Sequence, residues 1–179
     1  PYINIIIIIL NPLYNPPIFA INSCIFIYDL IVFVAIDADS IVIINNLAIG
    51  GAERVAGDDI NALLDAGVDV VLETLKHEGA QSFASQCRIS KEKWIVIPFR
   101  SMHDMRAWHQ MWRLLRSEKP DLIVSHLWYA NTIGRIAALF AGMQSNYIAV
   151  EQNVYDTIKT RRMFLYDYVL QFFCKKMIA

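Results

Sequence analysis

From residue 40 onward, hydrophobic positions follow two alternating patterns. Short runs of consecutive apolar, β-branched residues are followed by longer segments in which apolar residues recur every three or four positions. The first pattern is typical of strands buried on both faces, and the second is typical of helices with one buried face. The predicted strands cover residues 41–44, 68–75, 94–98, 122–125, 147–150 and 177–179.

Helices are predicted between these strands, over residues 52–66, from 105 to the turn at 119–121, over 131–141 and over 160–174. Gly67 and Gly142 are placed to end two of them, and Pro120 cannot continue a third. In helix 131–141, the side chains expected to point inward are Ile133, Ile136, Ala137 and Phe140. Repeated strand–helix–strand units imply right-handed crossovers, so residues 40–179 are predicted to form an α/β, Rossmann-like domain with a parallel sheet flanked by helices.

Residues 1–39 differ from the rest of the chain. They contain two apolar stretches, 3–10 and 18–36, on either side of a proline-rich patch, and no basic residue. The second stretch has nearly the length of about twenty residues that a membrane helix needs, but Asp29 lies near its middle. A membrane span, an additional strand or buried segment, and an artefactual extension of the reading frame all remain open. The chain begins at Pro1 and ends in a new apolar run, so we expect a fragment of a larger protein.

Composition excludes some classes of function. The net charge of −1 gives no electrostatic basis for binding nucleic acid. The three cysteines are far apart in sequence and form no C-x-x-C pair, which indicates reduced thiols rather than a disulfide framework or a zinc site. The sequence also contains no P-loop and no Ser-His-Asp arrangement.

Candidate chemistry is expected in the loops that follow the strands, because ligands of parallel sheets bind beyond the carboxyl ends of the strands. Gly50 and Gly51 stand at the start of the first helix, and Arg54 lies in its first turn. Free N–H groups and the helix dipole favour an anion such as a diphosphate there. A tight strand–helix turn without a ligand explains the two glycines equally well.

Two further loops carry polar side chains at the same predicted edge. His126 follows the fourth strand and is expected to point into a cleft, with Asn131 just beyond it. Glu151, Gln152 and Asn153 follow the fifth strand, and their side chains suit recognition of hydroxyl groups. The alternatives are a structural histidine and a loop or helix-cap network.

The last predicted helix, 160–174, combines basic ends with many aromatic residues. Such a helix can lie on an anionic membrane surface. A helix that faces the core and has basic ends is the alternative, and it is favoured here.

Four segments together resemble the N-terminal domain of glycosyltransferase family 4, the retaining sugar transferases with the GT-B fold. The segments are 47–55, 119–131, 134–135 and 151–153, and their order and spacing carry the resemblance. The resemblance covers residues 40–179. It implies one of two Rossmann-like domains that face each other across a cleft, with the second, nucleotide-binding domain absent from this chain.

The resemblance also implies roles for individual residues. His126 corresponds to the family histidine that contacts the transferred sugar, and it is the catalytic candidate. The substrate-binding candidates are Gly50, Gly51, Arg54, Asn131, Glu151, Gln152 and Asn153. The family often has Glu-His-Asn where this chain has Glu151-Gln152-Asn153, and glutamine cannot carry a proton or a positive charge.

The function implied is glycosyl transfer from a nucleotide sugar to a saccharide or lipid-linked acceptor, without a cofactor or metal. We expect a cytoplasmic location, extending to the inner face of the cytoplasmic membrane if helix 160–174 contacts lipid. The isolated chain is expected to be inactive. The alternatives are a non-catalytic binding domain and another enzyme of the same scaffold, such as a nucleotide-sugar epimerase.

Overall fold

The computed structural model describes residues 39–79, 81–151 and 160–178. The alternatives raised for the apolar N-terminal segment, and the predictions for Gln152 and Asn153, lie outside these residues.

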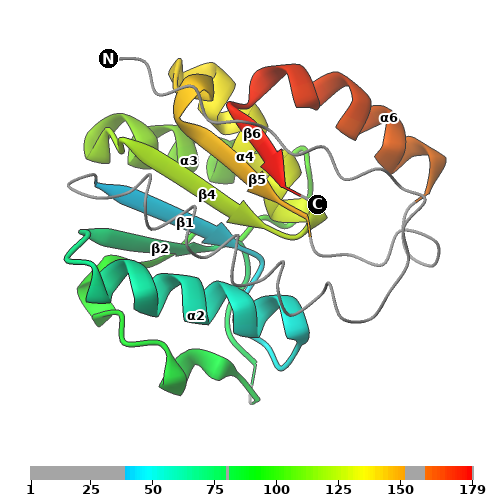
Figure 1. The fold of residues 1–179 in the computed structure, drawn as a ribbon. Helices are drawn as coiled ribbons and strands as arrows, with labels where there is room; N and C mark the ends of the chain where they lie inside the picture. Colours follow the sequence, from blue (N-terminus) through cyan, green and yellow to red (C-terminus); the bar gives the residue numbers. More distant parts are fainter. Residues whose placement is uncertain (1–38, 80, 152–159, 179) are drawn as a thin grey trace, which may run out of the picture.

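The described chain forms a single parallel sheet (Figure 1). Its order is β3-β2-β1-β4-β5-β6, with every neighbouring pair parallel. The strands are β1 (Ser40–Ile44), β2 (Val70–Thr74), β3 (Trp94–Val96), β4 (Leu122–His126), β5 (Tyr147–Val150) and β6 (Lys176–Ile178). The predicted α/β class and parallel sheet are confirmed.

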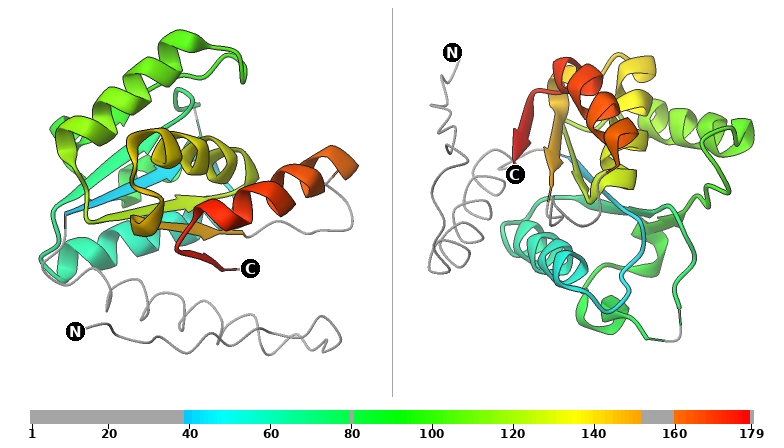
Figure 2. Two further views of the ribbon diagram at one scale, coloured as in Figure 1. Left: turned by 90° about the horizontal axis from the view of Figure 1, so that it is seen from above. Right: turned by 90° about the vertical axis from the view of Figure 1, so that its right-hand side faces the viewer.

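Helices cover both faces of the sheet (Figure 2). The helix α2 (Gly51–Asp65) lies on one face, and α3 (Met105–Glu118) and α4 (Trp128–Ala141) lie on the other, where α6 (Arg161–Leu170) packs beside α4. Short 3-10 helices occur at Phe83–Gln86, Lys91–Lys93, Gln144–Asn146 and Gln171–Phe173. Each face of the sheet therefore has its own hydrophobic core, one beneath α2 and one beneath α3 and α4.

The helix α4 lies very close to β5, and a glycine makes this approach feasible. A Cβ atom at Gly134 would collide with the ring and hydroxyl of Tyr147. Three small residues of α4, Ala137, Ala138 and Ala141, pack in the core beneath α3 and α4 together with Ile133, and all four are buried. The prediction that Phe140 points inward is wrong: its side chain is 73% exposed, because it lies on the side of α4 that is turned away from the buried stripe.

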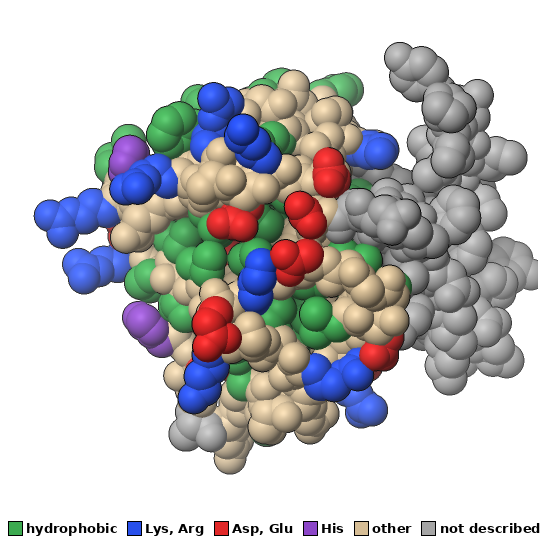
Figure 3. All heavy atoms as spheres, turned by 90° about the vertical axis from the view of Figure 1, so that its left-hand side faces the viewer, with side chains coloured by type: hydrophobic (Ala, Val, Ile, Leu, Met, Phe, Trp, Pro, Cys, Tyr) green, Lys and Arg blue, Asp and Glu red, His purple; other side chains and the backbone are tan. Residues whose placement is uncertain are grey.

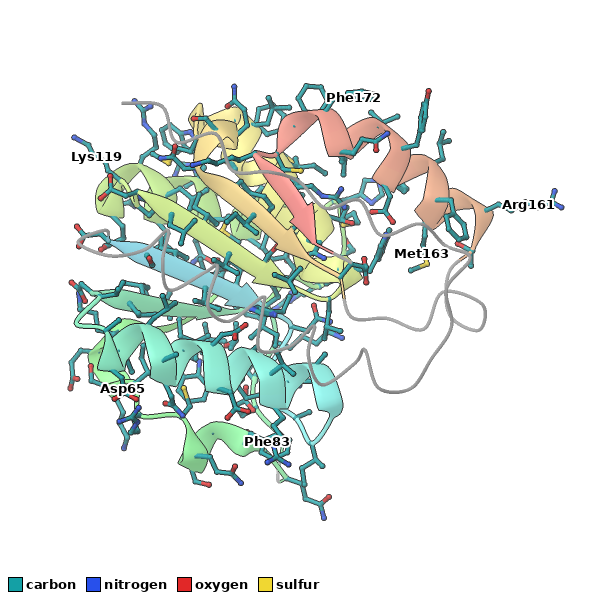
Figure 4. All side chains as sticks on the ribbon, viewed as in Figure 1. Asp65, Phe83, Lys119, Arg161, Met163 and Phe172 are labelled. Atoms are coloured by element: carbon teal, nitrogen blue, oxygen red, sulfur yellow. The ribbon has the colours of Figure 1, made fainter. Side chains whose placement is uncertain are left out.

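The helix α6 contacts the domain through few of its residues. Asp167 and Leu170 are buried, whereas its large apolar side chains face outward: Phe164, Leu165, Tyr166, Tyr168 and Val169, followed by Phe172 in the next turn. Figure 4 shows Phe172 pointing away from the sheet at one end of this segment and Arg161 at the other. The favoured interpretation of 160–174 as a core-facing helix is therefore wrong for most of its apolar residues.

Candidate functional site

The candidate site lies at the carboxyl edge of the three central strands. β4 lies between β1 and β5, with Ser125 opposite both Ile43 and Ala149, and His126 opposite Val150. The loops after these strands therefore begin side by side. The glycine turn and Glu151 lie in these loops, and His126 is the last residue of β4, so the structure brings the three predicted regions to one edge.

The opposite edge of the sheet has a different character. Figure 3 views the molecule from the amino ends of the strands and shows acidic and basic side chains intermingled. One such pair is Lys93 with Asp69, whose Nζ and Oδ2 atoms are 2.9 Å apart. This mixture of signs gives the amino edge no field of a single sign.

The glycine turn forms the N-terminus of α2. Gly50 is the N-cap residue, and no side chain caps the helix there. The Glu53 carboxylate folds back against Gly50, close enough to collide with a Cβ atom at that position. Gly51 and Arg54 are exposed. The helix start is thus accessible, and a carboxylate already occupies the region that favours negative charge.

The loop that leads into this turn is fixed by residues that the sequence did not single out. The Leu47 backbone N–H donates to Glu78 Oε1 at 2.8 Å, and the Ser82 hydroxyl donates to the Leu47 carbonyl at 2.8 Å. The Phe83 N–H donates to the same carbonyl at 2.7 Å. Because residues 76–93 carry no hydrophobic periodicity, only their contacts reveal that they hold the glycine turn in place.

His126, the last residue of β4, is fully buried at 0% exposure. The prediction that its side chain points into an open cleft rather than the core is therefore wrong for this structure. The ring lies on the α2 face of the sheet, where Nε2 is 3.5 Å from Asp59 Oδ2. Asp59 is itself only 3% exposed, and burial, with a smaller contribution from Asp58, raises its pKa to about 7.

The backbone directly after His126 is strained. Leu127 has φ 73° and ψ 151°, a region that is essentially restricted to glycine. Two hydrogen bonds hold this geometry: the Leu127 N–H donates to the Val150 carbonyl at 3.2 Å, and the Leu127 carbonyl accepts from the Asn131 N–H at 2.8 Å. Such outliers persist only when the surroundings enforce them, and they cluster at functional sites.

Asn131 lies on α4 and is 1% exposed. Its Nδ2 donates to the Val150 carbonyl at 2.9 Å, and its Oδ1 accepts from the Ser125 hydroxyl at 2.5 Å. The Tyr147 hydroxyl completes the network by contacting Ser125. The polar atoms of Asn131 thus connect α4 to β4 and β5, and its predicted contact with substrate stays a prediction.

Glu151 follows β5 and is 5% exposed. Of the predicted site residues within the described chain, the structure places Gly50, Gly51, Arg54, His126 and Glu151 in the loops at the carboxyl edge or in the helix turn that starts there. Gly51 and Arg54 are open to solvent, whereas His126 and Glu151 are buried.

Glu73 is a buried carboxyl group that the sequence analysis did not consider. It lies in β2 opposite Ile43, is 0% exposed, and neither of its oxygens has a hydrogen-bond partner among the described residues. Burial raises the pKa of this carboxyl group well above the ordinary value of 4.5.

Other features of the described residues lie apart from this edge. A shallow groove of about 340 Å³ runs between β3 and α3, lined by residues that include Ile95, Val96 and Arg113. Within the described ranges, no three His, Cys, Asp or Glu side chains are grouped as a metal site requires. No helix in the part of the chain that the structure describes is long and apolar enough to cross a membrane.

The parallel α/β fold, with a glycine turn and a histidine at one sheet edge, defines a Rossmann-like domain of the kind that makes up half of a GT-B enzyme. The model of the family described as Glycosyltransferase Family 4 matches residues 49–177. The chain therefore belongs to glycosyltransferase family 4. No curated protein matches it.

Proposed function

We propose that this chain is the acceptor-side domain of a retaining glycosyltransferase, which transfers a sugar from a nucleotide sugar to a saccharide or lipid-linked acceptor. In this proposal the nucleotide is bound mainly by a second domain of the full-length protein, and no metal takes part. The cytoplasmic side of the membrane is the proposed location, because nucleotide sugars and lipid-linked acceptors meet there.

One observation supports the proposal most strongly: the glycine turn, His126 and Glu151 lie at the carboxyl ends of three adjacent parallel strands. Backbone N–H groups at the start of α2 suit the diphosphate of a sugar donor. A histidine at the neighbouring strand end suits a sugar hydroxyl or the charge that develops when the bond to the diphosphate breaks. Two backbone hydrogen bonds, to Val150 and from Asn131, hold the strained Leu127 directly after His126.

The burial of His126 refines the proposed mechanism. An imidazole that is 0% exposed cannot act on substrate until the loops around it are rearranged. We propose that donor binding and closure of the second domain expose the ring, as in other enzymes whose sites are completed by closure.

The test is calorimetric titration of the full-length protein with UDP-sugars and GDP-sugars, followed by product analysis with saccharide and lipid-linked acceptors. We expect binding of one nucleotide class and transfer with retention of anomeric configuration. His126→Ala should lower kcat about a hundredfold or more. Phe140→Ser, at an exposed position on α4, is the matched control and should leave kcat unchanged.

The same experiment separates this function from its alternatives. Absence of binding to any nucleotide sugar would favour a non-catalytic binding domain. Formation of an epimerised free nucleotide sugar, with no acceptor modified, would favour an epimerase on the same scaffold.

We also propose that α6 makes peripheral contact with an anionic membrane. Six large apolar side chains of α6 and the following turn are at least 48% exposed, and the exposed basic residues Arg161 and Lys175 flank them. Aromatic side chains with basic neighbours favour the interface of an anionic bilayer. Co-sedimentation of the full-length protein with vesicles containing phosphatidylglycerol should be strong and should weaken in Phe172→Ser. Equal sedimentation with neutral vesicles would contradict the electrostatic part of this proposal.

A further inference from the structure

The pair formed by Asp59 and His126 joins two elements that border the candidate site. Asp59 comes from the middle of α2, and His126 ends β4. Their side chains are 3% and 0% exposed, and the Asp59 Oδ2 and His126 Nε2 atoms are 3.5 Å apart. Oδ2 has no hydrogen-bond partner among the described residues, so the imidazole is the nearest group that can compensate it.

The position of Asp59 follows from helix geometry. Ala56, Ile60 and Leu63 form the buried stripe of α2, and Asp59 lies three residues after the first and four before the last. A carboxyl group at this position must enter the core. Asp58, its neighbour in sequence, faces solvent.

Among the groups around Asp59, His126 is the basic one that can form an ion pair with it. The strand residues packed beneath α2 are apolar, among them Val42, Val124 and Val150. Asp58, which lies beside Asp59 on α2, is itself an acid and cannot compensate the Asp59 charge. Within the described chain, His126 is the one basic group in ion-pair distance of Asp59.

Two buried ionisable groups at this distance are stable when they share one proton. A charged Asp59 carboxylate beside a neutral imidazole would leave one buried negative charge without a counter-charge in the pair. With one proton between them, the pair is neutral overall, whichever atom carries it.

We propose that Asp59 is a positioning residue for His126: its carboxyl group orients the imidazole and keeps one proton within the pair across neutral pH. The catalytic consequence rests on the proposed function. When the proton is on the imidazole, the ring at the end of β4 is an imidazolium balanced by the Asp59 carboxylate. An imidazolium next to the site where a sugar–diphosphate bond would break stabilises the departing negative charge.

The first test measures the proton without any sugar. The imidazole nitrogen signals of His126 are followed by NMR from acid to alkaline pH in the full-length protein, in Asp59→Asn and in Asp58→Asn. The two variants remove the same formal charge from adjacent positions, one buried and one exposed. Asp59→Asn should lower the proton affinity of the imidazole about tenfold or more, and Asp58→Asn should change it far less. Equal midpoints in the wild type and Asp59→Asn would overturn the proposal.

A measurement on the wild type keeps the test valid if Asp59→Asn does not fold. The Asp59 carboxyl carbon and the His126 ring nitrogens should titrate together, with shared midpoints. Independent titration of the two groups would overturn the proposal.

The second test measures the reaction. The alkaline limb of the pH profile of kcat/KM should move to lower pH in Asp59→Asn and stay in place in Asp58→Asn. An equal loss of activity at every pH would indicate a structural role only. If the full-length protein transfers no sugar, the NMR result still stands, so failure of the proposed function and failure of this inference are distinguishable.

Discussion

Buried polar side chains on the two faces of the sheet differ in how completely they are hydrogen-bonded. Beneath α4, the side chains of Ser125, Asn131 and Tyr147 form a network with matched donors and acceptors. Beneath α2, Asp59 and His126 lie 3.5 Å apart without a hydrogen bond between them. A fully satisfied network specifies how elements pack, whereas a loosely matched titratable pair beside a strained backbone is typical of a functional site.

The largest expected effect comes from the α4 face, at the buried ion pair of Arg135 and Asp167. Their Nη2 and Oδ1 atoms are 2.6 Å apart, and the pair fixes α6 to α4. Arg135→Met leaves the Asp167 carboxylate buried without this partner and should lower the free energy of unfolding by about 3–5 kcal/mol. Urea denaturation measures the change.

The double variant Arg135→Met/Asp167→Leu is the control for this prediction. It replaces both charges by apolar groups and should recover most of the loss. If the double variant is as unstable as Arg135→Met, the pair contributes through packing rather than charge, and the contrast between the two faces weakens.

A second prediction concerns the close approach of α4 to β5. Gly134→Ala places a methyl group against Tyr147 and should cost about 1–3 kcal/mol of unfolding free energy. The cost should be smaller in a Tyr147→Phe background, because one of the colliding atoms is the hydroxyl. A double-mutant cycle by thermal or urea unfolding measures this coupling. If the changes in unfolding free energy of the two substitutions simply add, the Tyr147 hydroxyl does not contribute to the steric clash.

Glu73 is the exception on the α4 face, and its prediction concerns pH. Its pKa is raised in the folded chain, so it stabilises the fold at acid pH, and this stabilisation is lost as the pH rises from about 4.5 toward the folded-state pKa. The loss amounts to about 1.4 kcal/mol per pH unit at most.

Glu73→Gln keeps the shape and removes the proton equilibrium. Its unfolding free energy should therefore exceed that of the wild type increasingly as the pH rises from 5 to 8. The pKa of Asp59 is raised to about 7, so Asp59 also lowers the unfolding free energy as the pH rises. This contribution is the same in the wild type and in Glu73→Gln, so it cancels when the two unfolding free energies are subtracted. Parallel curves for wild type and Glu73→Gln would show that Glu73 has a partner that compensates its charge.

The smallest effect is expected on the exposed side of α6. Phe172→Ser should change the unfolding free energy by no more than about 0.5 kcal/mol, because the ring is 71% exposed. Leu170→Ser, two residues earlier and 7% exposed, should cost several times more. Chemical denaturation of the two variants measures both changes in unfolding free energy. A small change for Phe172→Ser would show that the exposed aromatic side chain does not stabilise the domain.

Much of this architecture could be predicted because buried strands have a distinctive composition. All five residues of β1 and β4 are buried, and their continuous apolar pattern locates them within one residue. Helix ends were equally clear, since Gly67 and Gly142 adopt positive φ values of 80° and 75°, which glycine tolerates.

The site was harder to predict because it depends on contacts across the chain. Periodicity places His126 at a strand end but does not tell whether α2 covers it. The helical spacing of Ala56, Asp59 and Leu63 is the signal that was available for the buried pair. Glu73 could have been identified as buried because it lies within a largely apolar strand. The strain at Leu127 has no signature in the sequence.

The short edge strand β3 affects whether the sheet can pair with strands of other molecules in a crowded solution. β3 consists of three residues and, among the strands that the structure describes, pairs with β2 alone. After one further residue comes Pro98, which has no N–H to donate. A strand from another molecule that paired with β3 could form only a few backbone hydrogen bonds, because β3 is short and Pro98 prevents the pairing from extending further. The β3 edge of the described sheet is therefore a poor seed for intermolecular β-aggregation.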